Sequence, residues 1–434
     1  MRTSHWVWQI SLAVCLSAFG AVPACGGARE VDLAAEYLPR LERILTENIV
    51  PFWYDRSLDR EHGGYIISFG PDGELIEPVK KMIVSQARTV WLFSRLACAR
   101  YEPERHLKAA RIGYEFLREK MWDHTHGGFY WQVDVTGDEK VVPIKHLYGQ
   151  AFGLYAISEY YLASGDDEAL DFATRFLRLL DEKAYDREYG GYIEAFHADW
   201  TALSSDESGP LGPGGLKLMN THLHLLEALT TYYRASKLDV AADRLRELID
   251  IETNAVVRKT LGACTDKYDR DWTPRLEGQY ARVSYGHDIE NVWLIMDACD
   301  ALGMKDQPFM DLCRTLFAYS LRYGYDDENG GFYYTGEFNE PADNRVKSWW
   351  VQAEAIVSAL RMYERTKDPK YLKVFEQTFG LIENRMVDWE TGEWHLQITP
   401  DGQAGGPKAG PWKAGYHNGR AMIECIEILR RWRN

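Results

Sequence analysis

The sequence predicts an all-α fold, an (α/α)6 barrel of six helical hairpins, from two observations. A short phrase with two glycines followed by an aromatic residue recurs along the chain. Between these phrases, apolar residues recur three and four positions apart, which is the spacing of helices that bury one side. Self-similarity at a fixed period is typical of repeat architectures. Six repeats of two helices, joined by short β-hairpin or Gly-Gly turns, would close into a toroid of twelve helices.

The glycine phrase occurs in four clear copies and one degenerate copy. These copies occupy residues 61–65, 125–129, 188–192, 328–332 and, in degenerate form, 390–394. The gap from Gly191 to Gly331 is 140 residues, about two repeats of the 63 or 64 residues that separate the first three copies. We therefore expect a missing copy within this gap and assign it to residues 266–272. Each phrase should make a tight turn into a short aromatic strand, such as residues 129–131.

Two helical stretches are expected in each repeat. Residues 86–101 and 105–121 form one such pair, and residues 149–163 and 167–180 form the next. No long linker rich in proline and serine interrupts residues 33–434, so we expect a single catalytic domain. An α-solenoid of the tetratricopeptide type fits less well, because its period is about 34 residues and includes no Gly-Gly turn.

The first residues have the pattern of an export signal. Residues 1–24 start with a basic residue and continue with an apolar run too short to span a bilayer permanently. Residues 22–25 then resemble a lipoprotein box, in which Cys25 would carry the lipid, and simple cleavage after Ala24 is the alternative. Residues 25–32 are expected to form a short linker. The sequence thus predicts an exported protein of the periplasm or cell envelope, bound to the membrane only through a lipid on Cys25.

The composition excludes several functional classes. The net charge of −15 would repel a polyanion, so no nucleic-acid partner is expected. The five cysteines beyond the export signal are widely spaced and suggest neither a metal motif nor a disulfide framework. We expect no metal and no cofactor. The 15 tryptophans and 26 tyrosines fit stacking on sugar rings, although most should lie in the core.

Residues 284–293 combine groups that suit acid/base chemistry on a carbohydrate. If the segment is helical from Gly286, then His287, Glu290 and Trp293 share one face. The imidazole titrates near neutral pH, the carboxylate can orient it, and the indole can stack on a sugar ring. A polar helix start with Trp293 as a core anchor would explain the same residues, and both interpretations stay open here.

Two further segments are more polar than a helical core requires. Asn220 and His224 lie four apart and share a helix face. His222 points elsewhere, so the His-x-His pair is not expected to bind metal, and His222 should be a structural hydrogen-bonding residue. Arg88 is the single cation of residues 86–91, in an otherwise apolar helical segment. It is either a substrate-binding residue or a buried arginine paired with an acidic core residue.

Two aromatic segments complete the candidate site. Trp350 and Glu354 lie four apart at a helix start, while Trp349 falls on another face and should be core. Trp412 and His417 lie in a loop that enters the last helix. Three histidines with few isolated carboxylates argue against ordinary glycoside hydrolysis, whereas histidine pairs suit abstraction of a proton next to a carbonyl. The predicted central pit comprises His224, His287, His417, Glu290, Glu354, Asn220, Arg88, Trp293, Trp350 and Trp412.

With these motifs, the chain resembles the N-acylglucosamine 2-epimerase superfamily, and most closely its cellobiose and mannobiose 2-epimerases. The resemblance runs from about residue 33 to the C-terminus and implies an (α/α)6 barrel. It also implies cofactor-free epimerisation at C2 of the reducing-end sugar of a β-1,4-linked disaccharide. The motifs that carry it are residues 86–91, 220–228, 286–293, 349–354 and 412–420.

The resemblance also implies roles for the acid/base residues. In the family, the histidines that match His287 and His417 remove and return the C2 proton through a cis-enediol intermediate. His224 would assist ring opening or polarise the C1 oxygen. Arg88 and Asn220 resemble residues that bind O1 and O2 and stabilise the charge of the enediolate.

Further roles follow from the same resemblance. Glu290 would orient His287, Glu354 would hold sugar hydroxyls, and Trp350 and Trp293 would stack on the two sugar units. Sibling activities remain open, namely a monosaccharide or N-acylhexosamine 2-epimerase or an aldose–ketose isomerase. From other classes, a glycoside hydrolase or lyase on the same toroid and a non-catalytic sugar-binding lipoprotein also remain open.

Overall fold

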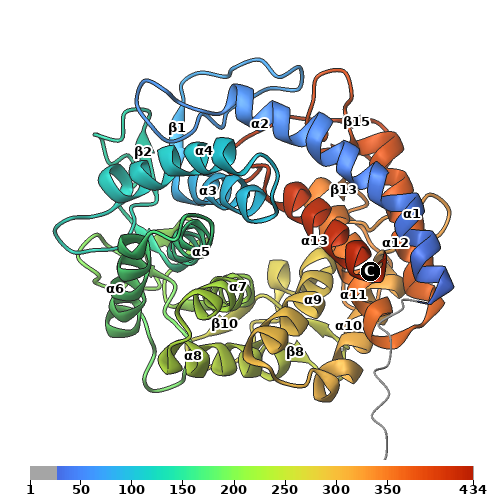
Figure 1. The fold of residues 1–434 in the computed structure, drawn as a ribbon. Coiled ribbons are helices and arrows are strands. Elements are labelled where there is room, and N and C mark those ends of the chain that lie inside the picture. The colour runs from blue at the N-terminus through green and yellow to red at the C-terminus, as the bar shows by residue number, and fades with distance from the viewer. Residues whose placement is uncertain (1–26, 434) are drawn as a thin grey trace, which may run out of the picture.

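The computed structural model describes residues 27–433, and its helices form two concentric rings (Figure 1). The proposed export signal, with Ala24 and Cys25, lies outside the described residues. Residues 28–32, which the sequence assigned to a linker, are instead the start of the first helix, where Glu30 is buried and accepts a hydrogen bond from Tyr363. None of the described helices is both long and apolar enough to cross a membrane.

The inner ring closes on itself. Each inner helix contacts the next one along the chain, and the last contacts the first. Most residues of these helices are buried, because each is covered by its two neighbours and by the outer ring. The inner helices are α3 (Ile83–Cys98), α5 (Leu147–Ser164), α7 (Met219–Ser236), α9 (Tyr285–Leu302), α11 (Trp349–Thr366) and α13 (Tyr416–Arg433).

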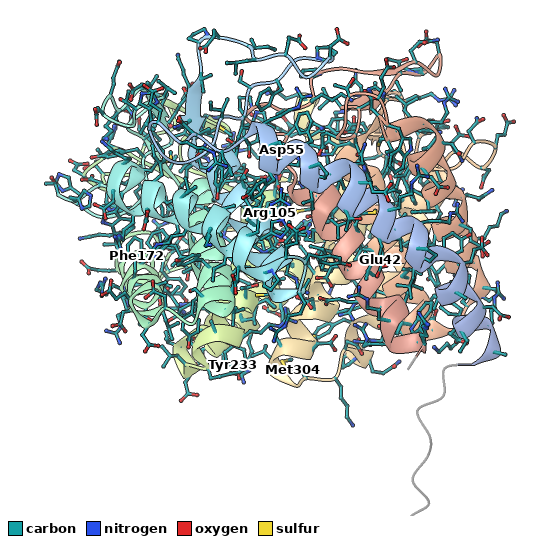
Figure 2. All side chains as sticks on the ribbon, turned by 45° about the horizontal axis from the view of Figure 1, so that its top comes forward. Glu42, Asp55, Arg105, Phe172, Tyr233 and Met304 are labelled. Carbon is teal, nitrogen blue, oxygen red and sulfur yellow. The ribbon has the colours of Figure 1, made fainter. Side chains whose placement is uncertain are left out.

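The outer ring alternates with the inner ring along the chain. Its helices bury one face and turn a polar face to solvent, and Figure 2 shows Asp55 and Arg105 on this outer surface. Its members are α1 (Ala28–Arg43), which a π-helical turn (Ile44–Ile49) joins to α2 (Val50–Arg56), then α4 (Pro103–Phe116), α6 (Asp167–Lys183), α8 (Asp239–Asp250), α10 (Met310–Gly324) and α12 (Pro369–Leu381). Further π-helical turns extend α4, α8 and α12, at Leu117–Met121, Ile251–Ala255 and Ile382–Met386. With α1 and α2 counted as one, the described residues form twelve helices, which confirms the predicted (α/α)6 barrel.

Short antiparallel strand pairs gather where the inner helices begin. Several inner helices directly follow a strand, and that strand pairs with another from a neighbouring repeat. These pairs fix the N-terminal ends of the inner helices relative to one another. The pairs are β1 (Lys80–Met82) with β2 (Gln132–Asp134), β3 (Lys145–His146) with β4 (Ala195–Phe196), β5 (Ser208–Gly209) with β6 (Gly212–Pro213), β7 (Leu216–Leu218) with β10 (Lys267–Asp269), β8 (Val257–Arg258) with β9 (Ala263–Cys264), β11 (Arg282–Ser284) with β12 (Thr335–Glu337), and β13 (Lys347–Ser348) with β14 (Gln397–Ile398), which also pairs with β15 (Ala404–Gly405).

The glycine phrases form the turns that follow the outer helices. In the second copy, Gly127 and Gly128 both have positive φ, 71° and 80°, which a residue with a side chain rarely adopts. A single bridge between Trp122 and Phe129 closes the turn, in place of the aromatic strand that the sequence predicted. Equivalent bridges close the other copies, for example between Tyr325 and Phe332.

The assignment of the missing copy to residues 266–272 was wrong. The turn lies at residues 257–264, where Val257 pairs with Cys264 at the same seven-residue offset. The pattern escapes notice because Arg258 replaces the usual aspartate and Ala263 replaces the second glycine. Residues 267–269 form β10 instead.

A buried ion pair fixes the turn at residues 123–129. Asp123 accepts hydrogen bonds from the backbone N–H groups of Thr125 and His126, while Lys145 Nζ donates to its other oxygen at 2.8 Å. The side chain of Gln150, on α5, bonds both the N–H and the C=O of Phe129 at 2.8 Å. Each turn of this kind therefore ties an outer helix to the start of an inner one. Analogous lysine–aspartate pairs join Lys81 to Asp59, Lys217 to Asp186, Lys347 to Asp326 and Lys408 to Asp388.

Replacing Lys145 with methionine should destabilise the barrel strongly. The substitution leaves the Asp123 carboxylate buried without its counter-charge, which typically costs about 3–5 kcal/mol. The loss is measured as the shift in the free energy of unfolding by chemical denaturation. The matched control is Arg246→Met, which removes an exposed ion pair with Asp243 and should cost about 1 kcal/mol or less. Equal effects of the two substitutions would contradict a role for the buried pair.

Candidate active site

A cavity of about 510 Å³ opens at the N-terminal ends of the inner helices, and we call it the front cavity. All six inner helices contribute to its wall, because their first turns converge where the strand pairs hold them. The volume is in the usual range for small-molecule sites. The structure brings together in this wall eight of the ten predicted site residues, Arg88, Asn220, His224, His287, Glu290, Trp350, Trp412 and His417.

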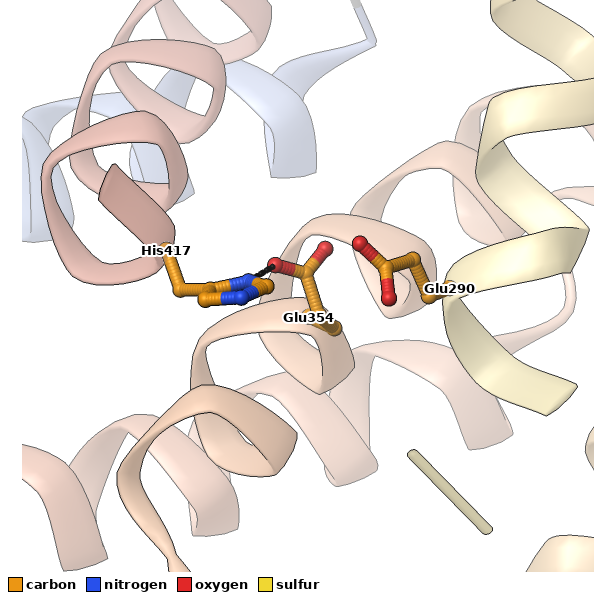
Figure 3. Close-up of side chains that lie close together, drawn as sticks. All are labelled: Glu290, Glu354 and His417. Atoms are coloured by element: carbon orange, nitrogen blue, oxygen red, sulfur yellow. Dashed lines mark hydrogen bonds and ion pairs between the residues drawn. The ribbon is translucent and has the colours of Figure 1, made fainter. Parts of the chain in front are cut away.

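Glu354 holds the ring of His417. The Nδ1 atom of His417 lies 2.6 Å from Glu354 Oε1, and both side chains are buried (Figure 3). Glu354 does not line the front cavity, so it stands behind the histidine and not among groups open to a ligand. The contact leaves Nε2 of His417 free of protein partners in the described chain. His417 therefore presents one ring nitrogen to the cavity in a fixed orientation.

Glu227 holds the ring of His224 in the same way. Nδ1 of His224 lies 2.9 Å from Glu227 Oε2, three residues further along α7, and both side chains are buried. The imidazole ring packs against the rings of Tyr148 and Phe152, with centroid separations of 5.0 and 4.8 Å. His224 is thus a second histidine with Nδ1 held by a carboxylate, while its Nε2 has no hydrogen-bond partner in the described chain.

His287 lies in the same wall and makes a different set of contacts. Its ring is 4.8 Å from the Trp350 ring, which in turn is 5.7 Å from the ring of His417. Trp350 is therefore flanked by both histidines. Glu290, predicted to orient His287, instead accepts a hydrogen bond from Arg420 at 2.7 Å. The carboxylate whose charge raises the pKa of His287, against the larger effect of burial, is that of Asp266.

Arg420 connects three buried glutamates beneath the front cavity. Its Nη2 donates to Glu290 Oε1 at 2.7 Å and to Glu354 Oε1 at 2.8 Å, and its Nη1 pairs with Glu227 Oε1. Tyr416 also donates to Glu227 through its hydroxyl. One guanidinium therefore binds both glutamates that hold a histidine, Glu227 and Glu354. We call Arg420, Glu227, Glu290 and Glu354 the arginine–glutamate cluster.

Two carboxyl groups of this cluster, those of Glu290 and Glu354, resist ionisation. Burial raises the pKa of Glu290 to about 8, although the guanidinium of Arg88 opposes the shift. Burial, and next the charge of Glu290, raises the pKa of Glu354 well above its usual range. Three carboxylates on one guanidinium would leave excess negative charge among side chains that are almost fully buried. The cluster therefore retains protons at neutral pH.

The three histidines are held in the neutral form. Burial lowers the pKa of His287 to about 4, with a smaller opposing effect from Asp266. Burial also lowers the pKa of His417 and of His224 well below the ordinary value, and the charge of Arg88 adds to both effects. Neutral imidazole can accept a proton, and its conjugate acid is then a strong donor.

Arg88 places a buried positive charge at the cavity. Its side chain is 3% exposed and donates to the carbonyl of Trp412 at 2.8 Å and to the Tyr148 hydroxyl at 3.1 Å. No carboxylate of the described chain forms an ion pair with it, so the interpretation as half of a core ion pair was wrong. Asn220 also lines the cavity, and its side-chain oxygen has no partner in the described chain. The Arg88 guanidinium can donate to a bound oxyanion, and the Asn220 oxygen can accept from a bound hydroxyl.

The tryptophans do not all lie where the sequence placed them. Trp412 is 42% exposed at the rim of the front cavity, while Trp350 is buried in its wall. Trp349, expected in the core, also lines the cavity. Trp293 does not: its Nε1 donates to Glu354 Oε2 at 2.9 Å, and the Arg420 guanidinium lies 4.8 Å from its ring. Trp293 is thus part of the layer beneath the site, which differs from its predicted role as a sugar platform.

His222 is the structural residue that the sequence predicted. It is fully buried, and its Nε2 accepts a hydrogen bond from the N–H of Tyr192 at 3.0 Å. It therefore fixes the glycine turn of the third repeat in the way that Gln150 fixes the second.

Several residues of the site were missed by the sequence reasoning. Glu227 lies three residues after His224, and Arg420 lies three after His417, so helical spacing could have indicated both. Tyr148 and Tyr334 line the cavity from segments without a distinctive motif.

Glu290, Glu354 and His417 lie close enough together to hold a metal ion, with one ligand atom from each within 4.8 Å of the others (Figure 3). A cation already occupies their carboxylates, since Arg420 donates to both glutamates. The donor set therefore fits a guanidinium site better than a metal centre.

Comparisons with known proteins find relatives over almost the whole chain. The sequence model of a family described as N-acylglucosamine 2-epimerase (GlcNAc 2-epimerase) matches residues 64–421. A cellobiose 2-epimerase of Ruminococcus albus is 34% identical over 406 residues, which cover 91% of this chain and 98% of that protein. A cellobiose 2-epimerase of Bacteroides fragilis is 30% identical and covers 90% and 97% of the two chains. The solved cellobiose 2-epimerase of Bacillus thermoamylovorans B4167 superimposes with a TM-score of 0.82 at 33% identity, over 90% of this chain and 99% of that one.

Replacing Arg420 with methionine should destabilise the protein in a pH-dependent way. The substitution leaves three buried glutamates without a counter-charge, for an expected cost of about 3–5 kcal/mol near pH 8. At pH 5 the deficit should shrink, because carboxyls with raised pKa values are then protonated and need no cation. Unfolding free energies of parent and variant at the two pH values give the comparison. Arg431→Met, which removes an exposed arginine of the same helix, is the control, and a deficit independent of pH would contradict the cluster model.

Proposed function

The chain belongs to the N-acylglucosamine 2-epimerase family, and from this premise we propose that it epimerises the reducing-end sugar of a β-1,4-linked disaccharide at C2. Relatives named cellobiose 2-epimerase match almost the whole chain at 30–34% identity, which supports a disaccharide substrate. The reaction is an isomerisation, so nothing is added to or lost from the sugar.

The observation that carries the proposal is the pair of neutral histidines whose rings both lie close to the ring of Trp350. Epimerisation at C2 requires a base that removes the C2 proton of the open-chain aldose and an acid that returns one to the opposite face. His287 and His417 both border the cavity at the Trp350 indole. Burial keeps both rings in the neutral form, in which one ring nitrogen can accept a proton.

In the proposed reaction, one imidazole takes the C2 proton, the electron pair of the C–H bond forms the C1–C2 double bond, and the π pair of the C1 carbonyl moves to O1, which gives the anion of a cis-enediol. Rotation about C2–C3 then exposes the other face, and the second histidine delivers a proton to C2. When C2 is reprotonated, the C1 carbonyl forms again. Negative charge develops on the sugar oxygens as the proton leaves. Arg88, with no carboxylate partner, and Asn220 are placed to stabilise that charge.

The contact between His417 and Glu354 explains how a histidine of such low pKa returns a proton. The raised pKa of Glu354 means that the pair retains a proton at neutral pH. When Nε2 of His417 gives its proton to the substrate, Nδ1 can take the proton shared with Glu354 across their 2.6 Å contact. His417 can therefore donate a proton without first existing as a stable imidazolium cation. His287 lacks such a carboxyl contact and is better suited to act first as a base in the forward direction.

The other residues divide between ring opening and binding. The Nε2 atom of His224, whose Nδ1 is held by Glu227, would polarise the C1 oxygen during ring opening. Trp350 and Trp412 offer stacking surfaces for the two sugar units. Glu290 lines the cavity and could bind a hydroxyl, a role that the sequence had assigned to Glu354.

Glycoside hydrolysis finds less support in this geometry. Hydrolysis of a glycosidic bond generally uses two carboxyl groups that flank it. Among the described residues, Glu290 is the single carboxyl in the wall of the front cavity. An aldose–ketose isomerase would use the same enediol with proton return to C1, and product analysis separates it from an epimerase. The predicted export signal, which we retain as a proposal, would place the reaction in the periplasm or cell envelope, with a lipid anchor if Cys25 is modified.

Incubation with cellobiose or mannobiose in D2O tests the proposal directly. The parent enzyme should form the C2 epimer without added cofactor and with deuterium at C2, as read by NMR. His287→Asn and His417→Asn should each lower the rate by about 10²–10⁴, because each removes one proton-transfer group. His124→Asn, at an exposed histidine outside the cavity, is the control and should leave the rate unchanged. Free monosaccharide, or an epimer without deuterium at C2, would refute the mechanism.

On acidification, activity should be lost only at a pH well below the ordinary pKa range of histidine. The pKa of His287 is lowered to about 4, so its base form persists at pH 5 and is lost only as the pH falls through about 4. An unperturbed histidine would lose its base form near pH 6.5. The measurement is kcat/KM between pH 4 and 8, with folding checked at each pH by circular dichroism. A decline centred near pH 6.5 in a fully folded protein would contradict the burial of the base.

A further inference from the structure

A second cavity of about 410 Å³, which we call the rear cavity, lies at the opposite end of the inner helices. The arginines that line it include residues of the last turns of α3, α7, α11 and α13. In Figure 2, Tyr233 near the end of α7 and Met304 just after α9 mark this end of the barrel. Glu227, Trp293 and Arg420 line the rear cavity, so the arginine–glutamate cluster separates it from the front cavity.

The charges of the rear cavity are paired with one exception. Each of its six arginines forms an ion pair with at least one carboxylate, as Arg234 does with Asp297 and Arg95 does with Glu427. Of its seven carboxylate side chains, Glu159 alone has no ion pair and no side-chain hydrogen bond in the described chain. Its side chain is 5% exposed. A buried carboxylate without a partner is costly, and this one borders a space large enough for a ligand.

Neutral oxygen atoms accompany this carboxylate. Tyr155 lies one turn before Glu159 on α5, so the two side chains share a face. Thr231 lines the cavity from the neighbouring α7. Neither hydroxyl has a hydrogen-bond partner in the described chain, although Tyr155 is 6% and Thr231 5% exposed. One carboxylate and two hydroxyls that line the same cavity therefore have no hydrogen-bond or ion-pair partner in the described chain.

The surroundings favour a cation of single charge. The C-terminal ends of the inner helices carry partial negative charge, which stabilises cations in the last turn. An anion would have to displace a carboxylate from an arginine, because every arginine here is already paired. A divalent ion would exceed the one unpaired negative charge. We propose that the rear cavity binds a small monovalent cation, an alkali-metal ion or ammonium, at Glu159 with Tyr155 and Thr231.

This proposal does not rest on the proposed function, and thermal unfolding tests it without an activity assay. At constant ionic strength, KCl or NH4Cl should raise the unfolding midpoint by about 1–3 °C relative to tetramethylammonium chloride, because a ligand bound only by the folded state stabilises it. The bulky tetramethylammonium ion donates no hydrogen bond and shields its charge behind methyl groups. Equal midpoints in the three salts would overturn the proposal.

Two variants and a direct measurement locate the site. Glu159→Gln should abolish the difference between the salts, while Glu168→Gln, at an exposed glutamate of α6, should keep it. Crystals soaked in thallium(I), an anomalous scatterer that mimics potassium, should show a peak in contact with the Glu159 carboxylate. A salt effect that survives Glu159→Gln, or a thallium peak elsewhere with none at Glu159, would refute the assignment even if the epimerase proposal holds. Loss of epimerase activity with an intact salt effect would leave the cation site standing.

Discussion

The guanidinium of Arg420 is the group on which the front cavity depends. It compensates three glutamates from three different inner helices, and two of these glutamates each hold a histidine of the cavity. Buried charges of this kind are stable only when they are fully paired and hydrogen-bonded, so their positions are tightly constrained. The orientations of His224 and His417 are therefore set from one point on α13, and this point lies in the layer between the two cavities.

The barrel fold determines how the other residues of the front cavity are brought together. Each inner helix begins beside a strand or a glycine turn that buried polar contacts fix in place, as Lys145 and Gln150 do in the second repeat. The first turns of six helices then meet at one end, which brings together residues as distant in sequence as Arg88 and Trp412. Burial in this wall lowers the pKa of the histidines and raises that of the glutamates. The same fold thus determines both the geometry and the protonation states on which the proposed chemistry relies.

Much of the fold and site could be predicted because the information was local. The repeated glycine phrase and helical spacing indicated the (α/α)6 barrel, and motifs at helix starts identified eight residues that line the front cavity. The fourth turn along the chain was misplaced because Arg258 replaces its aspartate and Ala263 its second glycine. The contact of His417 with Glu354 spans 63 residues and that of Arg420 with Glu290 spans 130, so no local pattern could reveal them. The position of Trp293 beneath the site follows from its bond to Glu354, which is equally non-local.

The central claim is that His287 and His417 serve opposite faces of one carbon atom. A crystal structure with an open-chain, reduced disaccharide tests it most directly, because such an alditol resembles the ring-opened substrate and cannot react. Our account predicts that C2 of the alditol lies between the two imidazoles, close to both rings, with its oxygens near Arg88. A complex in which C2 approaches only one histidine, or in which both rings face the same side of the carbon, would contradict it.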